Sequence, residues 1–329
     1  MTDVTVRQLD QEEWDKWDSW LALQPWSSPF SSTWWLAANC RAFGGRPLIL
    51  GAFDHDQMAG GVALRISDIG PVHVVRPSML YNPIVLGEGS THSRQRALAV
   101  LVDEMTRRRL VVLPLSCTTD TVDLREAVWR HWDLTVSWTV VSELKTWSAD
   151  RSVSRAELKQ GRKAERAGVV TRVEPLGADI LYDLMQASMS RQRQDAHLTR
   201  EQLRILAEAA GASGLLTVTR DNSGVPLGAG FVMAIGPRVV YDIWAGTSTK
   251  GLEMGVAAAR YLFLLKELQD RGYAYFDWCG ASQPGYSSFK LEFGGALATR
   301  LAVAREPLWF RAAEPVYARL HDIERRIRR

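Results

Sequence analysis

The same order of strands and helices is predicted twice along the chain, and this repetition constrains the fold more than any other feature. Apolar runs and alternation predict the strands, and apolar residues at helical spacing predict the helices. In the first half, strands are predicted near 3–8, 47–53, 58–67, 80–86, 110–116 and 133–141, and helices near 10–23, 31–43, 91–109 and 121–131. In the second half, strands are predicted near 168–175, 213–221, 224–235, 238–246, 273–279 and 299–305, and helices near 177–192, 199–210, 254–272 and the C-terminus.

Each half therefore has the order β-α-α-β-β-β-α-β-α-β, which indicates a mixed α/β fold made of two copies of one unit. The length of 329 residues also favours two domains, because single cores stop growing at about 250–300 residues. The segment 145–153 separates the two predicted units. We expect an N-terminal domain at 1–145 and a C-terminal domain at 146–329.

The composition excludes several classes of protein. Apolar residues make up 46% and charged residues 23% of the chain, which is ordinary for a soluble globular protein. No apolar run approaches the roughly 18–20 residues of a membrane helix, so no membrane span is expected. The polar, acidic N-terminal sequence lacks the pattern of a signal peptide. The cytoplasm is the expected compartment.

Three scattered cysteines and six dispersed histidines form no metal-binding or catalytic pattern, so no metal is predicted. The net charge of +3 does not by itself require nucleic acid, but basic residues gather at 151–172 and again at the C-terminus. Such a patch can hold phosphates without a high overall charge. The 13 tryptophans are interpreted mainly as core or inter-domain packing, with an aromatic ligand groove as the alternative.

A basic helix is predicted at 155–167, between the capping pair Ser154 and Glu157 and the stop at Gly168. Its basic residues fall at i, i+4, i+7 and i+11 and form one stripe. We interpret the stripe either as a solvated face or as a phosphate-binding surface for a nucleotide, tRNA or diphosphate. The stripe consists of Arg155, Lys159, Arg162 and Arg166. Gly161 inside this helix predicts a close approach by another element.

The stretch "FDWCGASQPGYSSFKLEFGG" places a single lysine among aromatic residues and glycines. Asp277 ends an apolar strand, a bend at 284–286 follows, and Phe289 and Lys290 are predicted to begin an extended segment that stops at 294–295. Loops at the ends of strands are common ligand sites in α/β folds, so Lys290 is a candidate catalytic residue. Asp277 is interpreted as a structural cap for the loop or, with less support, as a general base.

A third candidate is the strand, loop and helix at 241–261. Backbone amides at the start of a helix can hold a pyrophosphate, and acetyl-CoA enzymes of the GNAT type carry a Q/R-x-x-G-x-G/A loop there. The chain has Gly255-Val-Ala257, but Leu252 stands where glutamine or arginine is expected. Tyr241 is expected either to point into a cleft or to be a half-buried strand residue. Arg191 and Arg193 end a helix, as caps or as substrate-binding residues.

These segments resemble the Fem-type (FemABX) peptidyltransferases, which are tandem GNAT-like proteins. The family pattern is a basic helix ending in "k-G-v", a strand ending "fD-x-x-G", and then "G-x-x-x-F-K-x-x-F-G". The matching positions are Arg162, Lys163, Gly168, Val169, Asp277, Gly280, Gly285, Phe289, Lys290, Phe293 and Gly294. The resemblance covers the second half well, and covers the first half only through the order of elements and "SSPFSSTWWLAA".

The resemblance implies an enzyme with two tandem GNAT-like domains that moves an aminoacyl group from aminoacyl-tRNA to an amine and forms an amide bond. It places Phe289 and Lys290 in the transfer cleft, where an ammonium stabilises an oxyanion or anchors the tRNA terminus. No cofactor is implied beyond the aminoacyl-tRNA donor. The residues expected to bind substrate are Tyr241, Tyr286, Arg162, Lys159, Arg166, Arg191 and Arg193.

The acceptor is expected to be a peptidoglycan precursor or a small natural-product or peptide scaffold. The resemblance implies that family members acting on cell-wall precursors hold the acceptor's diphosphate with a lysine in the segment resembling 30–45. This chain has only Arg41 there, and this departure weakens the cell-wall acceptor. The alternatives are an N-acyltransferase that uses acyl-CoA and a non-catalytic binding protein with a cleft filled by tryptophans. The transferred amino acid and the oligomeric state stay open.

Overall fold

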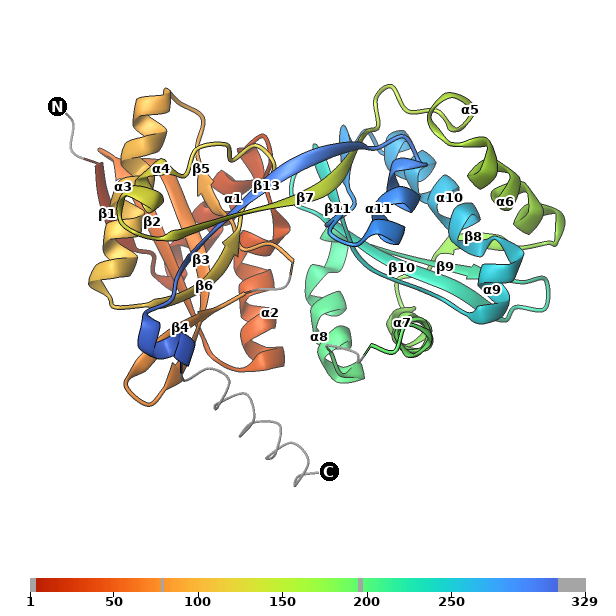
Figure 1. Ribbon diagram of the computed structural model, residues 1–329, viewed down its shortest axis with the longest axis horizontal. Coiled ribbons are helices and arrows are strands. Elements are labelled where there is room, and N and C mark those ends of the chain that lie inside the picture. The colour runs from red at the N-terminus through yellow and green to blue at the C-terminus, as the bar shows by residue number, and fades with distance from the viewer. Residues whose placement is uncertain (1–3, 78–79, 195–197, 313–329) are drawn as a thin grey trace.

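The protein consists of two lobes joined by a pair of long strands (Figure 1). The computed structural model describes residues 4–77, 80–194 and 198–312. The N-terminal lobe contains β1 (Val4–Gln8), α1 (Trp14–Leu23), α2 (Thr33–Phe43), β2 (Arg46–Asp54), β3 (Gln57–Ile69), β4 (Val72–Arg76), β5 (Ile84–Leu86), α3 (Thr91–Arg107), β6 (Val111–Ser116) and α4 (Arg125–Trp129).

The C-terminal lobe contains α5 (Ala149–Ser152), α6 (Arg155–Arg166), β8 (Val170–Val173), α7 (Ala178–Arg191), α8 (Arg200–Ala210), β9 (Gly214–Arg220), β10 (Pro226–Ala234), β11 (Val239–Thr247), α9 (Thr249–Met254), α10 (Val256–Asp270), β12 (Tyr275–Asp277) and α11 (Pro284–Leu291). The strands β7 (Asp133–Glu143) and β13 (Ala296–Arg305) cross between the lobes (Figure 1). The prediction of a mixed α/β fold is confirmed.

One hydrogen-bonded sheet runs through both lobes. Its strand order is β1-β2-β3-β4-β6-β13-β7-β12-β11-β10-β9-β8, with β5 paired to β3. β13 is the last strand in the described part of the chain, yet it pairs with β6 and β7, which precede the predicted domain junction. The boundary between 145 and 146 stays a prediction, because the final strand is shared with the first lobe.

Several predicted elements differ from the observed ones. β4 was not predicted, and the predicted strand near 80–86 is formed only over Ile84–Leu86. The predicted helix at 254–272 corresponds to α10, which begins after Gly255, a residue with a positive φ of 80°. The short helix α9 before it was not predicted. The predicted C-terminal helix begins within the described residues and otherwise lies beyond them.

The two lobes share an apolar core. Phe30, Trp35 and Tyr81 of the N-terminal lobe pack in one cluster with Tyr241 and Trp244 of β11. Ring centroids of Trp35 and Trp244 are 6.3 Å apart, and α2 packs against α8. Burial of aromatic surface is a large stabilising contribution, so these contacts hold the lobes together. The interpretation of tryptophans as inter-domain packing is confirmed for Trp35.

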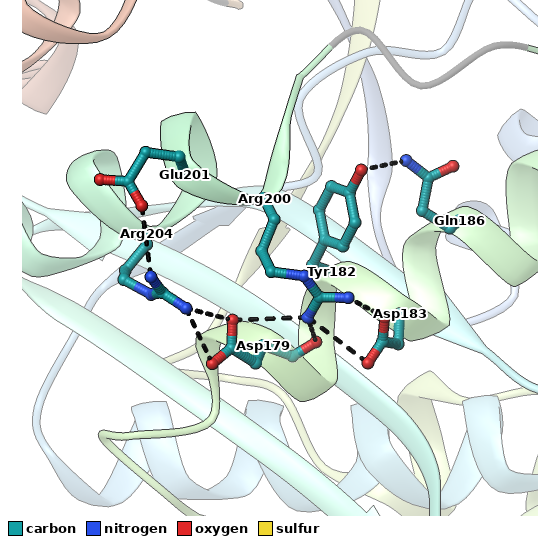
Figure 2. Close-up of polar contacts among 7 residues, drawn as sticks. All are labelled: Asp179, Tyr182, Asp183, Gln186, Arg200, Glu201 and Arg204. Atoms are coloured by element: carbon teal, nitrogen blue, oxygen red, sulfur yellow. Dashed lines mark hydrogen bonds and ion pairs between the residues drawn. The ribbon is translucent and has the colours of Figure 1, made fainter.

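A network of ion pairs joins α7 to α8 on the surface of the C-terminal lobe (Figure 2). Arg200 pairs with both Asp179 and Asp183, and its guanidinium lies 4.6 Å from the ring centroid of Tyr182. Arg204 pairs with Asp179 as well. Isolated surface pairs contribute little, but a shared network fixes the relative position of the two helices. None of the helices described in the chain has the length and apolar character needed to cross a membrane.

Candidate active site

The candidate site lies where two parallel strands separate. Residues Val239–Tyr241 of β11 pair with Tyr275–Asp277 of β12, and β11 then continues to Thr247 paired with β10 and no longer with β12. The chain leaves β12 through a loop and enters α11, which packs against β7. The carboxyl ends of parallel strands commonly form ligand sites in α/β folds.

Lys290 lies on α11, so the predicted extended segment at 289–295 is wrong. Pro284 occupies the first turn of this helix, where the missing N–H has no consequence and the fixed φ suits a helix. The Lys290 Nζ donates hydrogen bonds to the carbonyl oxygens of Trp278, at 2.7 Å, and Gly280, at 2.6 Å. An ammonium has three donors, so one N–H remains for a substrate oxygen.

Phe289 contributes to the core rather than to an open cleft. Its ring centroid is 5.6 Å from that of Tyr261 and 5.0 Å from that of Phe293. These contacts attach α11 to α10 and thereby orient the neighbouring Lys290. The contacts give Phe289 a positioning role, and its catalytic role stays a prediction.

Asp277 is completely buried, and both oxygens of its carboxylate accept hydrogen bonds. Oδ2 accepts from the Tyr81 hydroxyl at 2.6 Å, and Oδ1 accepts from Thr139 Oγ1 at 2.6 Å and from the Cys279 N–H at 2.8 Å. Burial raises the pKa of Asp277, and the hydrogen bonds from Thr139 and Tyr81 oppose that shift. These contacts support the structural cap and oppose the role of general base.

Asp242 is a carboxylate that the sequence pattern did not single out. Its Oδ2 accepts from the Tyr261 hydroxyl at 2.7 Å, whereas Oδ1 has no hydrogen-bond partner in the described part of the protein. Burial raises the pKa of Asp242, while the nearby positive charges of Arg260 and Lys290 and the hydrogen bond from Tyr261 lower it. No local motif marks this residue, because its partners come from α10 and α11.

Tyr241 is fully buried and does not line an open cleft. Its ring lies between Phe30 and Tyr81, with centroid distances of 5.6 and 5.5 Å. Its hydroxyl has no hydrogen-bond partner among the described residues. The prediction that Tyr241 points into a cleft is wrong in this conformation, because aromatic residues of the other lobe cover it.

The remaining polar candidates lie at the rim of the site. Tyr286 is 46% exposed, and its hydroxyl donates to Gln192 Oε1 at 2.8 Å, linking α11 to the end of α7. The guanidinium of Arg191 donates to the carbonyl oxygen of Thr247, so it is held by backbone. Arg193 is exposed and has a positive φ of 55°. Tyr286 and Arg193 remain accessible to a ligand.

The basic stripe is confirmed as one exposed face of α6. The stripe residues Arg155, Lys159, Arg162 and Arg166, together with Asp150, Leu158 and Glu165, line an open groove of about 760 Å³. Ser154 at the start of this helix bonds to both the carbonyl oxygen and the carboxylate of Glu292, at 2.8 Å each. Ser154 therefore links the start of the basic helix to Glu292, which follows α11 and lies two residues after Lys290.

The opposite face of α6 covers the start of α10. A Cβ on Gly161 would lie 2.4 Å from Leu262 Cδ1, which confirms the predicted close approach. A Cβ on Gly255 would lie 2.4 Å from the carbonyl oxygen of Gln160 on α6. Val256 is fully buried in a small apolar cluster against this helix. The start of α10 is therefore packed against α6.

The described residues contain no group of three or more histidine, cysteine or acidic side chains placed to hold a metal ion. The polar groups at the candidate site are the Lys290 ammonium, backbone carbonyls, tyrosine hydroxyls and carboxylates. This set suits hydrogen bonding to an organic substrate and charge stabilisation.

The comparisons with known proteins agree with this architecture. Residues 151–291 match the family model of the acetyltransferase (GNAT) domain. The whole fold is similar to that of FemX, with a TM-score of 0.72 and 12% sequence identity over 95% of this chain and 98% of that chain. Comparison with curated proteins gave no match.

Two further solved structures have similar folds. L-PGS from Bacillus licheniformis has a TM-score of 0.56 and 11% identity over 87% of this chain and 94% of that chain. A tandem GNAT protein from the clavulanic acid biosynthesis pathway has a TM-score of 0.53 and 12% identity over 92% and 98%. The chain thus has the predicted fold of two tandem GNAT-like domains, and the resemblance to Fem-type proteins is confirmed at the level of the fold. The family match supports acyl transfer as the class of reaction.

Proposed function

We propose that this protein is an aminoacyltransferase that moves an aminoacyl group from aminoacyl-tRNA to an amine acceptor. The observation that carries the proposal is the position of α6. Its apolar face covers the start of α10, where acyl-CoA enzymes of this fold hold a pyrophosphate, and its basic face lines an open groove. Ser154, which caps this helix, is bonded to Glu292, two residues after Lys290. This arrangement favours the polyanionic phosphodiester backbone of RNA over acyl-CoA.

In the proposed reaction the neutral acceptor amine attacks the ester carbonyl carbon of the charged tRNA. The new C–N bond forms as the carbonyl becomes a tetrahedral oxyanion, which the free N–H of Lys290 stabilises. The C–O bond to the tRNA ribose then breaks, leaving an amide. The proton lost by the amine ends on the ribose oxygen, so no external reactant is needed.

We assign the intermediate proton acceptor to Asp242 rather than Asp277. The Oδ1 of Asp242 is unpartnered among the described residues, and Lys290 contributes to its electrostatic environment. Burial raises the pKa of Asp242, which strengthens it as a base in its ionised form. Transfer is expected to increase as pH rises through this raised pKa, and Asp242→Asn is expected to remove that dependence.

The test measures transfer of radiolabelled amino acids from a total charged-tRNA pool to a panel of amines, with filter binding of charged tRNA in parallel. Lys290→Met is expected to lower transfer by about 100-fold or more, as loss of an oxyanion donor does. Lys266→Met is the matched control, because Lys266 is exposed on α10 and pairs with Asp270. Circular dichroism checks that both variants are folded.

Two further measurements identify the donor of the transferred group. RNase treatment is expected to abolish transfer, and Arg162→Gln with Arg166→Gln is expected to weaken tRNA binding. RNase-insensitive transfer from acetyl-CoA would instead support the acyl-CoA alternative. Failure of the protein to bind charged tRNA at physiological salt would contradict the proposal without reference to the acceptor.

A further inference from the structure

Strand β7 has a free edge where it crosses between the lobes (Figure 1). On one side, β13 pairs with β7 from Asp133 to Val141. On the other side, β12 pairs only with Val141–Glu143. Among the described strands, the second edge of β7 therefore has no partner strand between Asp133 and Val140.

The loop after β12 shows which backbone groups point toward this edge. The N–H of Trp278 donates to the carbonyl oxygen of Val140 at 3.0 Å, and the N–H of Ala281 donates to that of Trp138 at 2.9 Å. Backbone groups of successive residues alternate between the two sides of a strand. The N–H and carbonyl of Val136 therefore point toward the same edge as those of Trp138 and Val140.

The opposite strand agrees with this direction. Leu301 of β13 is paired with Val136, and its carbonyl oxygen accepts from the N–H of Cys117 after β6, so it points away from β7. The backbone groups of Val136 and of Leu134, two residues earlier, thus face the free edge, where no described backbone group bonds to them. Unpaired groups at a sheet edge form a template for another strand.

Solvent reaches this edge from both faces of the strand. Asp133–Val136 is a run of four exposed residues, although side chains in a strand alternate between faces. On one face, Leu134, Val136 and Trp138 are 44%, 51% and 45% exposed. The segment 134–142 contains no charged residue and no proline, which are the usual protections of an exposed strand edge. The edge is therefore open, apolar and ready to pair.

The free edge leads directly to the candidate site. Ala281, which bonds to Trp138, follows Gly280, whose carbonyl oxygen accepts from Lys290 Nζ at 2.6 Å. A strand added beside 134–138 lies in line with the segment 278–281, so one of its ends reaches the residues that hold the ammonium. This position suits the end of a peptide chain, because an amine there meets the proposed transfer site.

We propose that the free edge of β7 binds the acceptor as an extended peptide, which adds a strand to the sheet and presents its terminal amine near Lys290. The backbone groups of Leu134 and Val136 supply hydrogen bonds, and the exposed side chains beside them contact alternate residues of the peptide. The identification of this peptide as the acceptor rests on the proposed function. Its binding to the edge does not.

The test measures fluorescence anisotropy of a hexapeptide of alternating valine and threonine, with a free amino terminus and a fluorescein-labelled lysine added at its end. Val136→Pro is the informative variant, because proline removes an N–H that faces the free edge and leaves the bonds to β13 in place. Val136→Thr is the matched control, since it keeps the N–H and the shape of the side chain. Urea unfolding compares the stability of the two variants.

A second series uses the wild-type protein, so it does not depend on the folding of a variant. Each peptide bond of the hexapeptide is N-methylated in turn. In an added strand only every second N–H faces β7, so methylation is expected to weaken binding at alternate positions. A peptide held by its side chains alone would give no such alternation.

We expect saturable binding to the wild type and to Val136→Thr. In Val136→Pro the affinity is expected to fall about tenfold, because a hydrogen bond is lost and the proline ring obstructs the edge. No binding to the wild type, equal affinities in the two variants, or an N-methylation series without alternation would each overturn the proposal. Sedimentation showing a dimer that Val136→Pro dissociates would also overturn it, in favour of pairing between two copies.

Transfer from charged tRNA to the same peptide separates this inference from the proposed function. We expect the free amino terminus to accept the aminoacyl group and an acetylated one not to. Val136→Pro is expected to raise KM for the peptide while kcat is retained, since the edge binds the acceptor and does not take part in bond formation. Alternating binding without transfer would support the docking edge and count against the proposed reaction.

Discussion

The hydrogen bond between Tyr81 and Asp277 joins the two lobes. The substitution Tyr81→Phe measures how much this bond contributes to the free energy of unfolding. Both residues are fully buried, and the Tyr81 hydroxyl is the hydrogen-bond donor to Asp277 Oδ2, at 2.6 Å. The phenylalanine ring keeps the apolar packing but leaves that oxygen without its donor. Because hydrogen bonds to charged groups contribute about 1.5–3 kcal/mol, the free energy of unfolding is expected to fall by that amount.

Tyr241→Phe is the matched control, because Tyr241 is equally buried and its ring centroid is 5.5 Å from that of Tyr81. The Tyr241 hydroxyl has no partner in the described structure. Removing an unsatisfied buried hydroxyl removes a desolvation penalty, so the free energy of unfolding is expected to stay the same or increase. The two substitutions delete the same atom from neighbouring rings and are expected to have opposite consequences.

Urea unfolding followed by tryptophan fluorescence measures both variants. The Tyr81 hydrogen bond lowers the pKa of Asp277, so Tyr81→Phe is expected to raise that pKa further. A raised carboxyl pKa in the folded state means that stability declines as pH rises from the unfolded pKa, about 3.9, to the folded one. The difference in free energy of unfolding between Tyr81→Phe and the wild type is therefore expected to grow as pH rises between these two pKa values. Equal losses in the two variants, or no loss in Tyr81→Phe, would refute the reasoning.

Three further predictions concern the glycines, the buried carboxylate and the basic groove. Gly255→Ala is expected to destabilise the protein more than Gly272→Ala in urea unfolding. Both glycines have positive φ, where alanine costs about 1–2 kcal/mol, but only a Cβ on Gly255 meets a carbonyl oxygen of α6. Asp277→Asn is expected to reduce the decline in stability with rising pH above about pH 4, because it removes one buried carboxyl group with a raised pKa; urea titrations at several pH values measure this. Arg162→Gln with Arg166→Gln is expected to reduce the slope of log affinity against log salt for tRNA by about 1.4–1.8, if each arginine contacts one phosphate.

Local sequence signals located most elements but not the helix that carries Lys290. The capping pattern at Ser154 was sufficient to predict α6, and the amphipathic spacing was sufficient to predict α7 and α8, because those signals lie within each helix. The segment of α11 contains proline, glycine and serine, which indicate a turn when taken alone. The spacing of Phe289 and Phe293 at i, i+4 was the available sign of a helix, and their packing against Tyr261 outweighs the weak local propensity.

The polar interior of the candidate site could not be predicted from sequence. Tyr81 is separated from Asp277 by 196 residues, and no motif connects them. Asp242 lies in an apolar strand, and its partner Tyr261 lies in the following helix. The sequence did identify Lys290, because an isolated lysine among aromatic residues is unusual. It did not reveal that backbone carbonyls hold the ammonium.

The two glycines after Phe293 explain how this lysine is kept at the junction of the lobes. A Cβ on Gly295 would lie 2.1 Å from Val140 Cγ1, and one on Gly294 would lie 2.8 Å from the carbonyl oxygen of Ser152. Only glycine lets the chain leave α11 this close to β7 and α5. β13 begins at the next residue and pairs with β7 and then β6, so it continues into the sheet of the N-terminal lobe. Because α11 is tied through this strand to both lobes, the position of Lys290 depends on how the lobes are held together, which is why the buried contact between Tyr81 and Asp277 matters for the site.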